Sequence, residues 1–268
     1  MSGLLSLAVI AYVCATGLAL AYLIQREELI YRIGAVVTLG GWVLHGLALA
    51  SVGLQTGRPP VGTIADAISV AAWVAVGLMM WVERTYGLRV LSAFVLPVVL
   101  MLSLSSVTRA LGLGPIDRAL SSAWLTVHIA LALVGIAAFV LNFAGAIMYL
   151  LQERQLKGKR PGAVYYRLPS LATLDRLSYR TLAYGFPFLT IAIILGSLSA
   201  SAAWGSFFAF DPLAMLSFVA WAIYAATLAG RTAAGWHGRR AAYFSVIGFA
   251  ALVLTLGAGL FLPGRHGS

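Results

Sequence analysis

Four histidines are the residues of this chain whose side chains offer the most chemistry: His45, His128, His237 and His266. A neutral imidazole binds a metal ion through one ring nitrogen and uses the other nitrogen for a hydrogen bond. The single cysteine, Cys14, is expected to be buried in a helix, and one thiol excludes an intrachain disulfide and a Cys-X-X-Cys motif. The sequence has no Gly-rich phosphate loop and no pair of carboxylates in one helix, so we expect ligation rather than enzymatic turnover.

The segments that must position these histidines are apolar throughout. Of 268 residues, 61% are hydrophobic and 10% are charged, and the mean hydropathy is +0.94. Soluble domains carry about a quarter charged residues, whereas a membrane-spanning helix needs about 20 apolar residues in a row. The sequence predicts an all-α, polytopic membrane bundle that forms one transmembrane domain over residues 1–268. About eight helices are expected, at 4–23, 33–52, 65–82, 90–107, 124–151, 181–203, 212–229 and 241–262.

The connections between these helices carry nearly all the charge. With the amino terminus outside, the inner side receives Arg26, Arg32, Arg84, Arg89, Arg154, Lys157, Lys159, Arg160, Arg167, Arg176, Arg180, Arg231, Arg239 and Arg240. The outer side keeps four: Arg58, Arg109, Arg118 and Arg265. This bias predicts that both termini are extracytoplasmic and that the protein is a multi-pass protein of the bacterial plasma membrane. The net charge of +10 therefore reflects the topology of the protein in the membrane. It favours membrane lipid as a partner, and no nucleic acid is expected.

Two connections differ from the other loops. The inner loop 152–180 is the longest and most basic, and its second half, 170–180, is predicted to be a short amphipathic helix on the membrane surface. The outer loop 204–211 is short and aromatic.

The predicted topology brings three of the histidines to the same side. His45, His128 and His266 fall in the outer half of the bundle or on its outer surface, with loop 204–211, while His237 belongs to a solvated inner loop. An ionisable residue inside a membrane helix indicates a functional site, although a neutral imidazole that bonds a facing helix is the open alternative for His45.

Heme iron is the metal that this set of residues favours. Two opposed imidazoles can hold a heme between them, and aromatic side chains supply the flat walls that a macrocycle needs. A zinc site normally adds cysteine or carboxylate ligands. The expected heme site has His128, His266 and His45 as candidate iron ligands, with aromatic and basic side chains around the ring: Trp124, Trp204, Phe208, Phe210 and Arg265.

Several segments resemble one known family in order along the chain. They are Trp124-Leu-Thr-Val-His128, Tyr149-Leu-Leu-Gln-Glu-Arg154, Gly185-Phe-Pro-Phe-Leu-Thr190, Gly235-Trp-His-Gly-Arg-Arg240 and Gly264-Arg-His266. The chain resembles the heme-handling cytochrome c assembly family (the CcsA/CcmC-type superfamily), and in particular its HemX-like branch of eight-helix proteins.

The resemblance implies a b-type, non-covalent heme that a tryptophan-rich outer loop presents between two flanking histidines. His128 and His266 match those two histidines, and His45 matches a histidine in the second helix of the HemX-like branch. Phe208 and Phe210 stand where the family has tryptophan, so attachment of heme to apocytochrome thiols is not expected.

Three functions remain open at this stage. The first is a heme-binding protein that presents, stores or transfers heme at the outer face in cytochrome c maturation, with maturation proteins as partners. The second is a HemX-like regulator that contacts a heme-biosynthesis enzyme through the inner loop. The third is a heme-free transporter in which the histidines relay protons or line a pathway.

Overall fold

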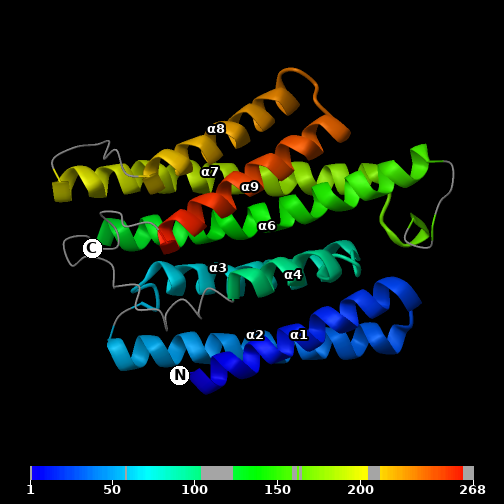
Figure 1. Cartoon of the computed structure of the whole chain (residues 1–268), viewed down its shortest axis with the longest axis horizontal. Helices are drawn as coiled ribbons and strands as arrows, with labels where there is room; N and C mark the ends of the chain where they lie inside the picture. The colour runs from blue at the N-terminus through cyan, green and yellow to red at the C-terminus, as the bar shows by residue number, and fades with distance from the viewer. Residues whose placement is uncertain are drawn as a thin grey trace.

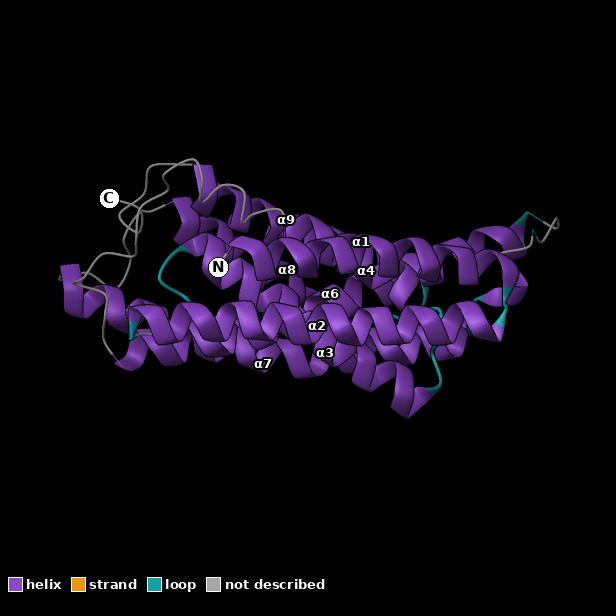
Figure 2. Cartoon of the chain, turned by 90° about the horizontal axis from the view of Figure 1, so that it is seen from below, coloured by secondary structure: helices purple, strands orange, loops and turns teal. Residues whose placement is uncertain are grey.

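The computed structural model describes residues 2–57, 59–103, 123–158, 162, 165–204 and 212–261. Over these residues the regular secondary structure is helical throughout (Figure 2). The helices are α1 (Ser2–Gln25), α2 (Glu28–Thr56), α3 (Ile64–Tyr86), α4 (Ser92–Ser103), α6 (Ala123–Lys157), α7 (Leu171–Trp204), α8 (Pro212–Thr232) and α9 (Arg239–Phe261), with one 3-10 turn, η3 (Tyr165–Arg167).

Seven of the described helices are long and apolar enough to cross a membrane: α1, α2, α3, α6, α7, α8 and α9. In a hydrocarbon layer every backbone amide must be bonded within the protein, and a helix achieves this with its own carbonyls. Helix α4 is apolar but has 12 residues, with Pro97 inside it. The prediction of an all-α, polytopic membrane bundle is confirmed.

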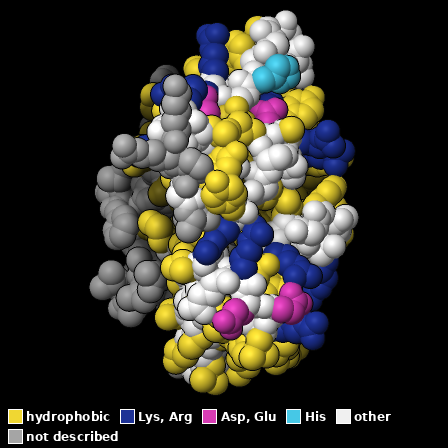
Figure 3. All heavy atoms as spheres, turned by 90° about the vertical axis from the view of Figure 1, so that its right-hand side faces the viewer, with side chains coloured by type: hydrophobic (Ala, Val, Ile, Leu, Met, Phe, Trp, Pro, Cys, Tyr) yellow, Lys and Arg dark blue, Asp and Glu magenta, His cyan; other side chains and the backbone are white. Residues whose placement is uncertain are grey.

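The helices run up and down one long axis, so their ends gather at two opposite poles (Figure 1). One pole holds the α1–α2, α3–α4, α6–α7 and α8–α9 connections, and Lys and Arg side chains cluster there (Figure 3). The start of α1 and the end of α9 lie at the opposite pole (Figure 1). We call the basic pole inner and the opposite pole outer, according to the positive-inside rule.

Helices α6 and α7 form the most closely packed pair. A Cβ at Gly185 of α7 would lie 2.9 Å from the Cβ of Ala138 on α6, and one at Gly135 would lie 3.4 Å from the backbone nitrogen of Leu189. Small residues let helix backbones approach one another, and this approach is what holds membrane helices together in the absence of a hydrophobic driving force. Helices α3 and α9 pack on the same central helix, α6.

The long inner loop predicted over 152–180 is shorter in the structure. Helix α6 continues to Lys157, whose ammonium lies 2.7 Å from Glu153, one turn earlier. The segment 170–180 is the start of α7 rather than a separate surface helix, because Leu174 and Leu177 are buried and the helix has no break before residue 181. The thiol of Cys14 is exposed on α1, so its expected burial is also corrected.

Candidate functional site in the outer half of the bundle

His128 lies in the second turn of α6, near the outer pole. Its Nδ1 lies 2.5 Å from the backbone carbonyl oxygen of Ala192 on α7. A carbonyl oxygen only accepts hydrogen bonds, so the imidazole proton resides on Nδ1 and the lone pair on Nε2. Metal-binding histidines are often oriented in the same way, by a backbone carbonyl that accepts from one ring nitrogen.

Gly196, one turn after Ala192, provides the space for this imidazole. A Cβ at Gly196 would lie 2.8 Å from Cε1 and 2.9 Å from Nδ1 of His128, well inside van der Waals contact. Sequence reasoning missed Gly196. The available signal was the spacing of four between Ala192 and Gly196, which is the small-residue pattern of close helix packing.

An apolar cavity of about 210 Å³ adjoins His128 between α3, α6, α7, α8 and α9. The hydroxyls of Ser199, Ser217 and Thr255 in its wall each donate to a carbonyl of their own helix. His128 is the one ionisable side chain among the described residues that line the cavity: Ile64, Ala67, Ile68, Leu125, Ile129, Ala132, Leu133, Ile136, Leu189, Ala192, Ile193, Gly196, Ser199, Ala200, Leu213, Ser217, Leu252, Thr255 and Leu256.

His45 lies in a different setting, fully buried between α1, α2 and α3. Its Nε2 lies 2.9 Å from the hydroxyl of Ser69, and its Nδ1 lies 3.4 Å from the hydroxyl of Tyr12. The Tyr12 ring also meets the imidazole edge to face, with centroids 5.8 Å apart. Both ring nitrogens therefore have hydroxyl partners on facing helices.

Helix α3 lies between the two histidines. Ser69 contacts His45 on the α2 side, whereas Ile68 belongs to the wall of the His128 cavity on the α6 side. Because Ser69 and Ile68 are neighbours on one helix, the two histidines lie at similar depth, but each has its own surroundings. The structure does not bring His45 and His128 into one cavity.

The remaining predicted site residues lie at the outer pole or beyond the described chain. Trp124 is in the first turn of α6, four residues before His128, and Trp204 ends α7. Four further residues fall outside the described residues: Phe208, Phe210, Arg265 and His266. His237 is exposed in the connection between α8 and α9 at the inner pole.

Helices α2 and α3 are joined by a reciprocal tryptophan pair beside His45. The indole of Trp42 donates to the backbone carbonyl of Trp73 at 3.0 Å, and Trp73 donates to that of Trp42 at 2.9 Å. The rings stack 4.8 Å apart and within 4° of parallel. A Cβ at Gly46 would lie 3.1 Å from the Trp73 indole nitrogen, so a glycine makes room for this ring. This pair fixes the position of His45 relative to α3.

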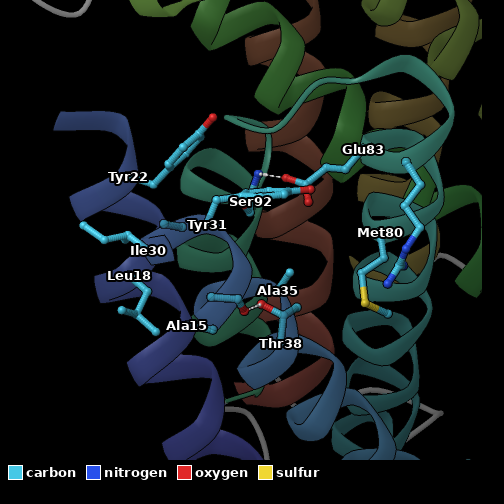
Figure 4. A pocket seen from close by; sticks show the side chains of 13 residues that line it. Ala15, Leu18, Tyr22, Ile30, Tyr31, Ala35, Thr38, Met80, Glu83 and Ser92 are labelled. Carbon is cyan, nitrogen blue, oxygen red and sulfur yellow. Dashed lines mark hydrogen bonds between the residues drawn. The ribbon is translucent and has the colours of Figure 1, made fainter. Parts of the chain in front are cut away.

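A second cavity, of about 220 Å³, lies near the inner pole between α1, α2, α3 and α4. Figure 4 shows the carboxylate of Glu83 beside Ser92 and Tyr31. Glu83 is 8% exposed, and its Oε1 accepts a hydrogen bond of 2.8 Å from the backbone nitrogen of Ser92, the first residue of α4. An acid at a helix start satisfies an unpaired amide and the positive end of the dipole. Glu83 therefore anchors α4 to α3.

These features define a polytopic helical membrane protein with an imidazole beside an apolar cavity in its outer half. The family described as Cytochrome C assembly protein matches residues 61–264. The match covers most of the chain, so the chain belongs to the cytochrome c assembly protein family.

Relatives of known description cover nearly the whole chain. "Cytochrome c biogenesis protein CcsA" of Guillardia theta is 26% identical over 92% of this chain and 89% of its own length. The protein of the same name from Gloeobacter violaceus is 27% identical, with the same two coverages. A solved structure of the cytochrome c heme lyase CcmF is similar with a TM-score of 0.64 at 17% identity. It matches 94% of this chain, which spans 45% of that longer chain, and it shows a shared fold.

Proposed function

We propose that this protein holds a non-covalent, b-type heme near the outer pole of the bundle and presents it during cytochrome c maturation. The observation that carries the proposal is the state of His128. Its ring is held by the Ala192 carbonyl, and it is the one ionisable side chain among the described residues that line an apolar cavity. An apolar wall with one neutral imidazole suits a flat macrocycle with a central iron.

His266 is proposed as a second residue that would hold the iron, and Arg265 as one that would pair with a heme carboxylate through a charge-assisted hydrogen bond. The rings of Trp124, Trp204, Phe208 and Phe210 are proposed to cover the macrocycle, as the order of these residues in the sequence indicates. The names of the relatives support a role in cytochrome c biogenesis.

We propose presentation of heme rather than its covalent attachment. When bound, heme supplies an iron centre that two imidazoles can ligate. What this chain supplies is a fixed tautomer at His128 and a cavity whose hydroxyls are bonded to their own helices. His45, with a hydroxyl partner for each ring nitrogen, is proposed as a separate site that binds iron only after one of these hydrogen bonds breaks.

Regulation of a heme-biosynthesis enzyme through the inner loop 152–180 has less support. The leucines that would have faced a partner, Leu174 and Leu177, are buried at the start of α7. A Cβ at Gly145 on α6 would lie 3.5 Å from the Leu177 side chain, so this leucine already has a helix to pack against.

The test is an absorption spectrum of the purified protein in oxidised and reduced form. The wild type is expected to show a Soret band, and His128→Ala is expected to lose most of it. His237→Ala is the matched control, because this imidazole is exposed at the inner pole. Equal heme content in the two variants would refute the assignment of His128.

A further inference from the structure

The largest of the described cavities that adjoin α6 opens on the side of the bundle in its inner half. It has a volume of about 490 Å³ and lies between α3 and α7. Its described lining residues come from α3, α6, α7 and the α3–α4 connection: Leu78, Trp81, Val82, Tyr86, Leu88, Val134, Ala138, Leu141, Thr173, Arg176, Leu177, Arg180, Thr181, Tyr184 and Phe188.

This groove follows from how three helices pack. Helix α7 lies close against α6 through Gly135 and Gly185, and α3 packs on another side of α6. Helices α3 and α7 make few contacts with each other, so they form the two walls and α6 forms the floor. Val134 and Ala138 on the floor have small side chains, which leave room between the two walls.

The chemistry of the groove changes along its length. At the inner end are Arg176 and Arg180, on successive turns of α7 and both exposed. The guanidinium of Arg180 donates to the Tyr86 hydroxyl at 3.3 Å and lies 5.8 Å from the centre of that ring. Farther along, the walls are apolar or aromatic, and no carboxylate is among the described residues of the lining.

The length and position of the groove match one leaflet of a bilayer. Twelve residues separate Arg176 from Phe188, which is about 18 Å at 1.5 Å per residue. One leaflet contributes about 15 Å to the hydrocarbon core. Trp81 and Tyr184, which are 58% and 69% exposed, flank the groove with amphipathic rings of the kind found where hydrocarbon meets headgroups.

We propose that this groove binds an anionic phospholipid of the inner leaflet. Its phosphate lies between Arg176 and Arg180, and one acyl chain lies along α6 between α3 and α7. An anionic headgroup suits the site better than a zwitterionic one, because the described lining offers two guanidinium groups and no acid for an amine. The bound lipid joins α3 to α7, adding to the contact between Arg180 and Tyr86. This proposal stands independently of heme binding.

The experiment compares lipid retention and thermal stability of the full-length protein purified in detergent. Phosphorus per protein is measured, the sample is delipidated, and phosphatidylglycerol or phosphatidylcholine is added back. We expect phosphatidylglycerol to raise the unfolding temperature and phosphatidylcholine to leave it unchanged. The double variant Arg176→Gln/Arg180→Gln should bind phosphatidylglycerol about thirty-fold more weakly, since each basic residue near an anionic surface contributes about a fivefold factor.

Two further variants separate a seated lipid from general charge attraction. Arg154→Gln/Lys157→Gln removes the same charge from exposed residues of the inner pole outside the groove, and it should retain lipid as the wild type does. Val134→Trp leaves both arginines in place but fills the floor, and it should lose retained lipid. Equal retention by all variants, or equal stabilisation by the two lipids, would overturn the proposal. So would an occupant that contains porphyrin and no phosphorus.

Discussion

Replacement of Gly196 by alanine tests the His128 geometry without changing any ligand. The new Cβ would lie 2.8 Å from Cε1 of His128, where ordinary contacts begin at 3.4 Å, so the ring must move by the difference of 0.6 Å. Such overpacking costs about 1–3 kcal/mol. The same displacement lengthens the hydrogen bond to Ala192, which is worth about 1 kcal/mol.

The affinity for heme reports this displacement. If 1–3 kcal/mol is lost from the heme-bound state, Gly196→Ala binds heme about 5- to 150-fold more weakly. The assay is heme titration of the apoprotein followed by the Soret band. Gly17→Ala is the matched control, since its Cβ would have nothing within 4 Å and alanine favours a helix. Wild-type affinity in a folded Gly196→Ala protein would refute the role of His128.

Three further predictions concern the contacts that hold the bundle together, measured by thermal or denaturant unfolding in detergent. Trp42→Phe should lower the free energy of unfolding by about 1–3 kcal/mol, because the Trp73 carbonyl loses its indole donor. The double variant Trp42→Phe/Trp73→Phe should lower it by less than the sum of the two single changes, and strict additivity would show that the rings act separately. Glu83→Leu should lower the free energy of unfolding by about 1–3 kcal/mol, because the Ser92 amide loses its acceptor. Glu83→Gln keeps an acceptor and should lower it by less, so equal losses would argue against the capping role. Asp175→Ala should lower the free energy of unfolding by about 3–5 kcal/mol, because the buried guanidinium of Arg231 loses its carboxylate partner at 2.8 Å. An effect below about 1 kcal/mol would show that water takes the place of the carboxylate.

The fold was predictable because hydropathy and charge act locally along the chain. The sequence placed His128 near the outer pole and His237 at the inner pole, since apolar run length and the positions of arginines determine both. The start of α7 was harder to predict. Leu174 and Leu177 have the spacing of a surface amphipathic helix, and only their contact with α6 shows that the same helix continues into the bundle.

The site itself depends on contacts that sequence spacing does not encode. Ala192 is 64 residues from His128, and its contribution is a backbone carbonyl, which no side-chain motif reveals. The separation of His45 from His128 by α3 also depends on how α2, α3 and α6 pack. The position of each histidine within its apolar run places both at a similar depth in the membrane. It does not tell on which side of α3 each lies.

The most direct test of the central claim is rescue of His128→Gly by free imidazole. The variant removes the side chain and leaves a space that an added imidazole can fill. We expect the purified variant to lack most of the Soret band of the wild type, and imidazole to restore heme binding with a wild-type spectrum. Full heme content without imidazole, or no recovery with it in a folded protein, would contradict ligation of heme iron by His128.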